Sequence, residues 1–299
     1  MNKTKNTDFI QRFYFKGQPF RGAIVNLQNS FIESLNNHNY PISVNNLLGQ
    51  GLAATLLMGI HLKQNTKISI QARGNDLLKL LISEACLFLD YDNTSTHTVR
   101  AVARLNEKFK HSDFDNKKSL SELMVNGQLA ITIEPENKKR YQGIVSIDFD
   151  SLAECLMCYF NQSEQLRTFI HLTNTETRVA GFLIQQMPNE ETFEENPDVW
   201  ETLQILANTI SNEELIDLQS KELLHRLFHE FDLQLNSSDK VEFSCSCSQE
   251  RTVETLKQID PKEILSILDE DKEVIMDCDF CSSRYRFTKS QLINFGIPI

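Results

Sequence analysis

The sequence predicts an α+β fold in three parts: a mixed α/β core over residues 1–188, a helical linker over 189–240, and a small domain held by cysteines over 241–299. Three observations lead to this prediction. Helix and strand patterns are mixed in the first part without regular alternation, acidic residues dominate the second, and four cysteines occur as two close pairs in the third. A chain of 299 residues is long enough for one large or two modest domains.

Apolar residues at helical spacing predict core helices over 27–35, 47–62 and 152–159. The second contains the most apolar run of the chain, residues 52–62, which is shorter than the roughly 20 residues that a membrane span needs. We therefore expect a buried helix there and no membrane partner.

Strand patterns occur at 67–73, 98–104, 129–134, 141–148, 167–172 and 178–186. In the third of these segments, Leu129, Ile131 and Ile133 alternate with small or polar residues, as a half-buried strand requires. Pro135 begins a turn into the next segment, so residues 129–148 predict a hairpin.

The linker is acidic but not of low complexity. Between Asn189 and Lys240, thirteen acidic residues stand against three basic ones. Apolar residues nevertheless keep helical spacing over 199–210 and 224–228, so short amphipathic helices are expected, with residues 236–239 as an exit loop. Short helices depend on tertiary packing, so this segment could detach from what it covers. An ordinary helical subdomain with a solvated acidic face is the alternative.

The last part of the chain predicts a small module. Residues 241–243 and 274–276 have strand patterns, and Asp260 followed by Pro261 and Glu263 predicts a helix start with its cap. So short a module with few large apolar side chains needs a further stabilising link.

Four cysteines near the end supply such a link. They form the motifs Cys245-Ser-Cys247 and Cys278-Asp-Phe-Cys281, and four thiolates are the full ligand set of a closed tetrahedral zinc site. We expect one Zn²⁺, bound only when the thiols have lost their protons, so that binding and folding are coupled.

The same sulfurs could react with oxidants. A zinc-bound sulfur stays thiolate-like, and a neighbour two or three positions away can convert its oxidised form into a disulfide. A disulfide within Cys245-Ser-Cys247 would close a small strained ring, and strained disulfides are easily reduced. A purely structural zinc site remains the alternative.

Composition favours a cytoplasmic, non-nucleic-acid-binding protein. The net charge is −11 and the isoelectric point is near 5.2, whereas phosphate binding needs a cationic surface. Residues 1–8 lack the apolar core of a secretory signal. No P-loop, dinucleotide fingerprint or nucleophile elbow occurs, so we expect no enzyme activity of those classes.

Three further cysteines lie outside these motifs. Cys155 and Cys158 share an apolar helical stripe, which indicates core packing or an accessory thiol pair. Cys86 lies in the apolar run 77–89 and is expected in the core.

These residues together resemble the heat shock protein 33 family of redox-regulated holdase chaperones. The resemblance covers essentially the whole chain, and the spacing of the four cysteines is its most specific feature. The C-terminal match runs through 241–251, 267–271 and 278–281, with Tyr285 and Phe287 after the last cysteine. Individually weaker matches in the core, in the family's order, lie at 21–22, 52–55, 101–104, 140–143, 159–160 and 163–166.

The resemblance implies that zinc on four cysteines keeps the reduced form folded and nearly inactive. Oxidation is then expected to release zinc and to form the disulfides Cys245–Cys247 and Cys278–Cys281. The switch domain and linker are then expected to unfold and to expose apolar surface that holds unfolding client proteins without ATP. The oxidised form is expected to be a homodimer. We hypothesise that the client-binding surface includes Val199, Leu203, Leu206, Ile210, Leu224, Leu227 and Phe228.

One departure from the family pattern and two rival functions remain. Met157 and Cys158 stand where the family leads us to expect acidic residues, so the core carries an extra thiol. Basic residues in 241–299 keep open a structural zinc ribbon that recruits nucleic acid or a protein partner. A thiol–disulfide oxidoreductase using Cys278 and Cys281 is the second rival, although no thioredoxin-like βαβ pattern surrounds that pair.

Overall fold

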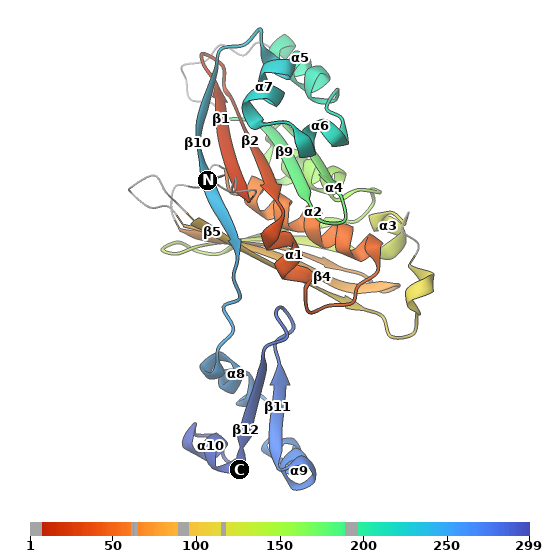
Figure 1. Ribbon diagram of the computed structural model, residues 1–299, viewed down its shortest axis with the longest axis vertical. Helices are drawn as coiled ribbons and strands as arrows, with labels where there is room; N and C mark the ends of the chain where they lie inside the picture. The colour runs from red at the N-terminus through yellow and green to blue at the C-terminus, as the bar shows by residue number, and fades with distance from the viewer. Residues whose placement is uncertain (1–7, 61, 63–64, 89–95, 115–117, 189–196) are drawn as a thin grey trace, which may run out of the picture. The chain divides into compact units, whose positions relative to one another are not determined.

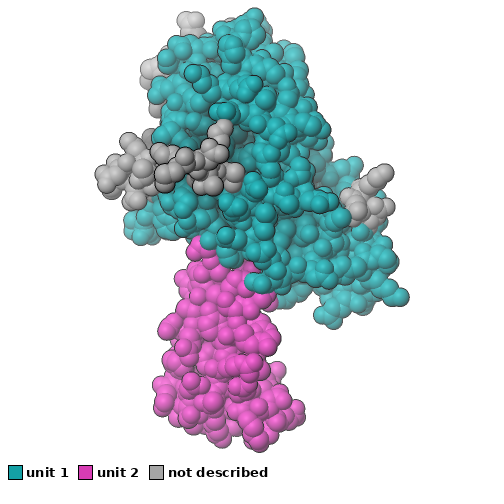
Figure 2. Space-filling model, viewed as in Figure 1, with its two compact units in different colours: residues 1–243 teal, residues 244–299 magenta. Residues whose placement is uncertain are grey.

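One ten-stranded sheet organises the larger part of the chain in a computed structural model (Figure 1). The structure describes residues 8–60, 62, 65–88, 96–114, 118–188 and 197–299. The chain divides into two units, residues 1–243 and 244–299, which Figure 2 distinguishes by colour. The mixed α and β architecture expected from the sequence is confirmed. The compact division falls at residue 243, because the described linker residues pack with the sheet.

The order of strands in the sheet is β7-β6-β3-β4-β5-β10-β1-β2-β9-β8. All neighbours are antiparallel except β5 and β10, which are parallel. Strand β10 therefore joins the two halves of the sheet. The strands are β1 (Phe9–Phe15), β2 (Phe20–Leu27), β3 (Thr66–Arg73), β4 (Leu78–Leu87), β5 (Thr96–Leu105), β6 (Gln128–Pro135), β7 (Tyr141–Ser146), β8 (Thr168–Asn174), β9 (Val179–Gln186) and β10 (Leu233–Phe243).

The predicted strands form close to their expected positions, and β6 and β7 make the expected hairpin. Strands β1 and β2 were not predicted. Strand β2 is buried on both faces, so it lacks the alternation that reveals a half-buried strand. The apolar run 77–89 contains β4, where Cys86 is half-buried rather than in the core.

The exit loop expected at residues 236–239 is wrong, because these residues lie within β10, where Ser238 and Asp239 pair with β1. Asn, Ser and Asp usually mark turns, but here tertiary contacts supply their partners. The side chain of Gln11 donates a hydrogen bond to the carbonyl oxygen of Asn236 at 2.8 Å, and an irregularity in β1 between Gln11 and Phe13 adjusts the register.

Helix α2 (Ile42–Met58) forms the centre of the first core. It is buried on nearly every side, as its apolar composition predicts. A Cβ atom at Gly51 would lie 2.2 Å from Ser83 Oγ, so glycine allows the helix to approach β4 closely. The helix ends before His61, which lies outside the described residues. The other helices of this region are α1 (Asn29–Leu35), α3 (Leu120–Leu123) and α4 (Leu152–Tyr159), with a 3₁₀ turn at His111–Asp113 and a π turn at Phe160–Glu164.

The linker helices cover the opposite face of β1, β2 and β9. They are α5 (Pro197–Ala207), α6 (Asn212–Asp217) and α7 (Ser220–Phe228), and Figure 1 shows them grouped over these strands. Along β9, Val179 and Leu183 pack in the core around α2, whereas Phe182 packs in the cluster with the linker helices. The sheet is therefore covered on both faces here. Within the described ranges, no helix has both the length and the apolar character to cross a bilayer.

The smaller unit has its own small core. It contains α8 (Gln249–Leu256), α9 (Pro261–Asp271), β11 (Glu273–Asp277), β12 (Arg284–Thr288) and α10 (Lys289–Asn294). The predicted helix start is confirmed: Asp260 accepts a hydrogen bond from the Lys262 N–H at 2.9 Å, and Pro261 is the first helical residue. The buried core consists of Val253, Leu256, Ile264, Leu268, Val274, Phe287, Leu292 and Ile297.

Asp239 of β10 contacts basic residues of both neighbouring strands. It contacts Arg12 of β1, and its carboxylate lies 3.5 Å from Nε2 of His97 on β5. The side chain of Asp239 is 13% exposed and that of His97 is fully buried. Burial alone would raise the pKa of Asp239, but the hydrogen bonds and charges of His97 and Arg12 outweigh burial and hold this pKa below its ordinary value.

We predict that Asp239→Asn lowers the free energy of unfolding of the larger unit by about 2 kcal/mol near neutral pH, since it leaves Arg12 without its counter-charge. Because the folded pKa is lowered, the carboxylate stabilises the fold above its unfolded pKa of about 4 and loses this effect as the pH falls through the folded pKa. The variant should therefore lose less stability on acidification.

Urea denaturation followed by circular dichroism at several pH values measures both effects. Asp232→Asn is the matched control, because Asp232 is 70% exposed in its pair with Lys16, and its effect should stay within about 0.5 kcal/mol. Equal losses in the two variants would show that Asp239 does not help to hold the halves of the sheet together.

Candidate metal centre

The four cysteines predicted as ligands meet in the smaller unit. The Sγ atoms of Cys245, Cys247, Cys278 and Cys281 all lie within 4.8 Å of one another. The first two cysteines belong to the segment between β10 and α8, and the other two belong to the turn between β11 and β12. All four are half-buried free thiols. This group could hold a metal ion.

The β11–β12 turn brings Cys278 and Cys281 together. The Cys278 N–H donates to the carbonyl oxygen of Ser283 at 2.9 Å, and the Ser282 N–H donates to the carbonyl oxygen of Cys278 at 2.8 Å. Ser282 adopts a φ of +57°, in the left-handed region that a tight turn uses. Two hydrogen bonds from Arg284 to the Asp277 carboxylate, at 2.8 and 2.9 Å, close the base of the hairpin.

The start of α8 positions the other pair. Ser248, directly after Cys247, caps this helix by accepting a hydrogen bond from the Arg251 N–H at 3.3 Å. The guanidinium of Arg251 reaches back to the carbonyl oxygen of Ser246 at 2.8 Å. The residue between the two cysteines is therefore anchored to the helix.

The nearest sulfur contacts join the two motifs. Cys245 Sγ lies 3.7 Å from Cys278 Sγ, and Cys247 Sγ lies 3.4 Å from Cys281 Sγ. Both separations are far longer than the roughly 2.05 Å of a disulfide bond. The disulfides expected from the family resemblance join cysteines within one motif, whereas these contacts join cysteines of different motifs. The expected disulfides therefore stay predictions.

Two hydroxyl groups contact the sulfurs. Tyr285 Oη of β12 donates a hydrogen bond to Cys247 Sγ at 3.1 Å, and this bond raises the pKa of Tyr285 to about 12. Ser283 Oγ lies 3.2 Å from Cys281 Sγ. Burial alone would raise the pKa of Cys281, but hydrogen bonds from the Ser283 hydroxyl and N–H and from neighbouring thiols lower it to about 7. Burial, the largest effect, raises the pKa of Cys278.

The donor set fits a thiophilic metal ion. Four sulfurs converge on one point, Cys281 has a pKa lowered to about 7, and hydroxyl donors support the thiolate charge. Ser283 was not singled out by the sequence analysis, and Tyr285 was noted only as part of the family motif. No local pattern reveals which hydroxyl faces a sulfur.

The structure also places the other predicted residues. Leu203, Ile210, Leu224, Leu227 and Phe228 are buried against the sheet, and Val199 and Leu206 are partly buried in the same cluster. The client-binding surface proposed for them is therefore covered in this state. In contrast, Ile205 of α5 is 66% exposed, and the helical pattern did not mark it.

The remaining cysteines lie away from the centre. Cys155 is buried on α4, and burial raises its pKa to about 11, whereas Cys158 is half-buried. Core packing is thus confirmed for Cys155 and only in part for Cys158.

A sheet covered on one face by short helices, with a separate unit in which four thiols could hold a metal ion, defines the class of this two-unit protein. The family model for the Hsp33 protein matches residues 8–288. The 33 kDa chaperonin of Hahella chejuensis is 39% identical over 286 residues, which cover 95% of each chain. The 33 kDa chaperonin of Histophilus somni is 39% identical over 292 residues, 96% of each chain.

A solved structure agrees in fold. The 33 kDa chaperonin of Thermotoga maritima superimposes with a TM-score of 0.76 over 97% of each chain, at 19% sequence identity. The chain belongs to the Hsp33 family of chaperones.

We predict that Tyr285→Phe weakens metal binding about tenfold, because it removes a hydrogen bond to one ligand sulfur. Titration with Co²⁺ against a competing chelator measures the affinity, and sulfur-to-cobalt absorption bands report thiolate ligation. Affinity should rise with pH, since the ligand thiols must lose their protons. Tyr141→Phe, at an exposed position on β7, is the control. Equal affinity in both variants would exclude a role for the Tyr285 hydroxyl.

Proposed function

We propose that this chain is a cytoplasmic, redox-regulated holdase that binds unfolding client proteins without ATP. Its membership of a chaperone family supports client binding. The observation that carries the redox part of the proposal is the four-thiol cluster, because a metal held there would stabilise a unit whose own apolar core is small. The chain acts in this proposal by binding, not as an enzyme.

Cys245, Cys247, Cys278 and Cys281 would hold one Zn²⁺ in the reduced form. Zinc bound by four thiolates supplies no catalysis here and contributes folding free energy, of the order of 10–16 kcal/mol in comparable small sites. The hydroxyls of Tyr285 and Ser283 support two of the thiolates.

Oxidation would remove this stabilisation. In each motif, two zinc-bound thiolates give up two electrons to one hydrogen peroxide molecule and a sulfur–sulfur bond forms. The oxygen–oxygen bond breaks, two protons are taken up from solvent, and two water molecules are released. The proposed products are the disulfides Cys245–Cys247 and Cys278–Cys281. A disulfide sulfur is no longer a thiolate ligand, so the metal leaves and the small unit loses its fold.

The linker would then expose its apolar face. Residue 244 follows directly on the end of β10, so unfolding of the smaller unit removes the ordered chain that follows this strand. Helices α5–α7 are short and depend on packing against β1, β2 and β9. Their detachment exposes the surface that we propose for clients: Val199, Leu203, Leu206, Ile210, Leu224, Leu227 and Phe228, together with the strand residues beneath them.

The proposal divides the chain by function into 1–188, 189–240 and 241–299. The first part is the stable core, the second the detachable linker, and the third the zinc-binding redox switch. The newly exposed apolar surface also favours the homodimer proposed for the oxidised form, because contiguous apolar patches drive association.

We predict that the oxidised chain suppresses aggregation of a heat-denatured client and that the reduced, zinc-loaded chain does not. Light scattering from the client measures this difference, and a reductant with added zinc should reverse it. Cys278→Ser with Cys281→Ser removes one disulfide, so its suppression should no longer change with peroxide. Cys86→Ser with Cys158→Ser is the matched control and should keep the full response. Equal suppression by both redox forms would refute redox regulation.

We further predict that oxidation shifts tryptophan fluorescence to longer wavelength. Trp200 on α5 is the single tryptophan of the chain, is 8% exposed, and stacks on Phe20 with ring centroids 5.8 Å apart. Since the smaller unit contains no tryptophan, the shift reports the linker alone. Full zinc release with unchanged emission would show that the linker stays docked.

A further inference from the structure

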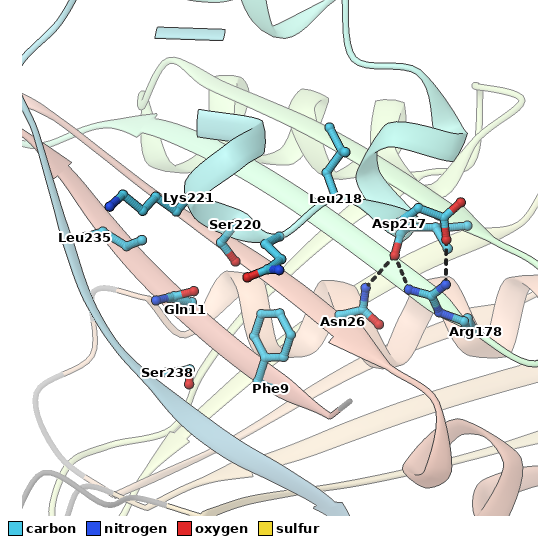
Figure 3. A pocket seen from close by; sticks show the side chains of 12 residues that line it. Phe9, Gln11, Asn26, Arg178, Asp217, Leu218, Ser220, Lys221, Leu235 and Ser238 are labelled. Atoms are coloured by element: carbon cyan, nitrogen blue, oxygen red, sulfur yellow. Dashed lines mark hydrogen bonds and ion pairs between the residues drawn. The ribbon is translucent and has the colours of Figure 1, made fainter. Parts of the chain in front are cut away.

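A pocket of about 550 Å³ lies between the linker helices and the sheet (Figure 3). One wall is the junction of α6 and α7, and the other walls come from β1, β2 and β10. The four cysteines are not part of it. Its volume is within the range of small-molecule sites, about 300–1,000 Å³.

On one side, the polar groups of the pocket already have partners. Asn26 Nδ2 donates a hydrogen bond to the carbonyl oxygen of Ile216 at 3.2 Å, and Arg178 also donates to this oxygen. Arg178 pairs with the carboxylate of Asp217 at 2.7 Å, as the dashed lines in Figure 3 show. The acidic group lining the pocket is therefore neutralised.

On the other side of the pocket, hydrogen-bond donors of α7 lack acceptors among the described residues. The first turn of α7 lines the pocket, and no side chain caps this helix at Gln219. The hydroxyl of Ser220 is directed toward Phe9 and Gln11 in Figure 3, and this residue is only 5% exposed. Within the described part of the chain, this hydroxyl has no hydrogen-bond partner.

Lys221 adds a positive charge at the rim of the pocket, with its side chain directed away from Ser220 in Figure 3. It is exposed, and among the described residues it has no ion-pair partner. The uncapped N-terminus of a nine-residue helix attracts negative charge and presents backbone N–H groups. Together with a buried hydroxyl that lacks an acceptor, these groups match an anion. The rest of the lining is partly apolar, through Phe9, Leu218 and Leu235.

We propose that this pocket binds a small organic anion, a carboxylate or phosphate attached to an apolar group. The anionic oxygens accept hydrogen bonds from the Ser220 hydroxyl and the first N–H groups of α7, with Lys221 alongside. The apolar group lies against Phe9 and Leu235.

Binding would stabilise the docked linker. The walls of the pocket come from both the linker and the sheet, so the site exists only while α6 and α7 are docked. A ligand at 100 times its dissociation constant then shifts the equilibrium toward the docked state about 100-fold. This consequence rests on the proposed function, whereas the site itself does not.

Calorimetric titration of the reduced full-length chain with phenyl phosphate tests the site. We expect saturable binding of one molecule, and binding about tenfold weaker for inorganic phosphate, which lacks the apolar group, and for benzyl alcohol, which lacks the charge. Benzoate distinguishes the two head groups, and binding of either aromatic anion supports the proposal. Absence of saturable binding by both, or equal binding of benzyl alcohol, would overturn it.

Two variants locate the site. Lys221→Gln should weaken binding of phenyl phosphate about tenfold, and Lys139→Gln, an exposed position in the turn between β6 and β7, should leave it unchanged. Ser220→Ala should weaken binding without lowering the melting temperature of the free chain, because it removes a buried hydroxyl that has no partner. Unchanged binding in both pocket variants would place the ligand elsewhere.

The effect on the linker is measured separately. Phenyl phosphate should delay the Trp200 emission shift on oxidation in the parent chain and not in Lys221→Gln. If phenyl phosphate binds but does not delay the emission shift, the proposed site is supported and its coupling to the linker is refuted. An absent emission shift in the free chain would count against the proposed function alone.

Discussion

Strands β2 and β9 carry apolar side chains on both faces, so the fold must cover the sheet twice. Val25 and Val179 face the core around α2, whereas Ile24 and Phe182 face the linker helices. The first cover is one long helix within the core. The second consists of three short helices that would not be stable alone. Both faces of the sheet are therefore apolar. We expect the local stability to be lowest on the face that is covered by the short helices α5–α7.

The smaller unit has the opposite problem, since it buries too few apolar side chains. Its core residues come from short elements, and the four sulfurs lie where β11, β12 and the segment before α8 meet. In the proposed function, the chemical state of those sulfurs decides whether this unit is folded. The proposed function thus joins a unit whose stability would depend on thiol chemistry to a cover of short helices that depend on packing.

Local patterns in the sequence predicted the features that local interactions determine. The β6–β7 hairpin, the Asp260 cap and the meeting of the two cysteine motifs are examples. Only the end of strand β10, residues 241–243, was predicted, because Asn236–Asp239 resembles a loop until Arg12 and His97 contact Asp239. The burial of the linker face against the sheet and the hydroxyl of Tyr285 beside Cys247 are likewise products of tertiary contact.

The position of β10 also determines when the sheet can be completed. This strand pairs residue 9 with residue 240, and it alone joins β5 to β1. During synthesis, more than two hundred further residues must therefore leave the ribosome before the aromatic face of β1 has its last partners. Contacts of such long sequence separation form slowly, and a nascent chain with an uncovered strand is prone to aggregate. The growing chain passes through a stage in which its own apolar strands need protection.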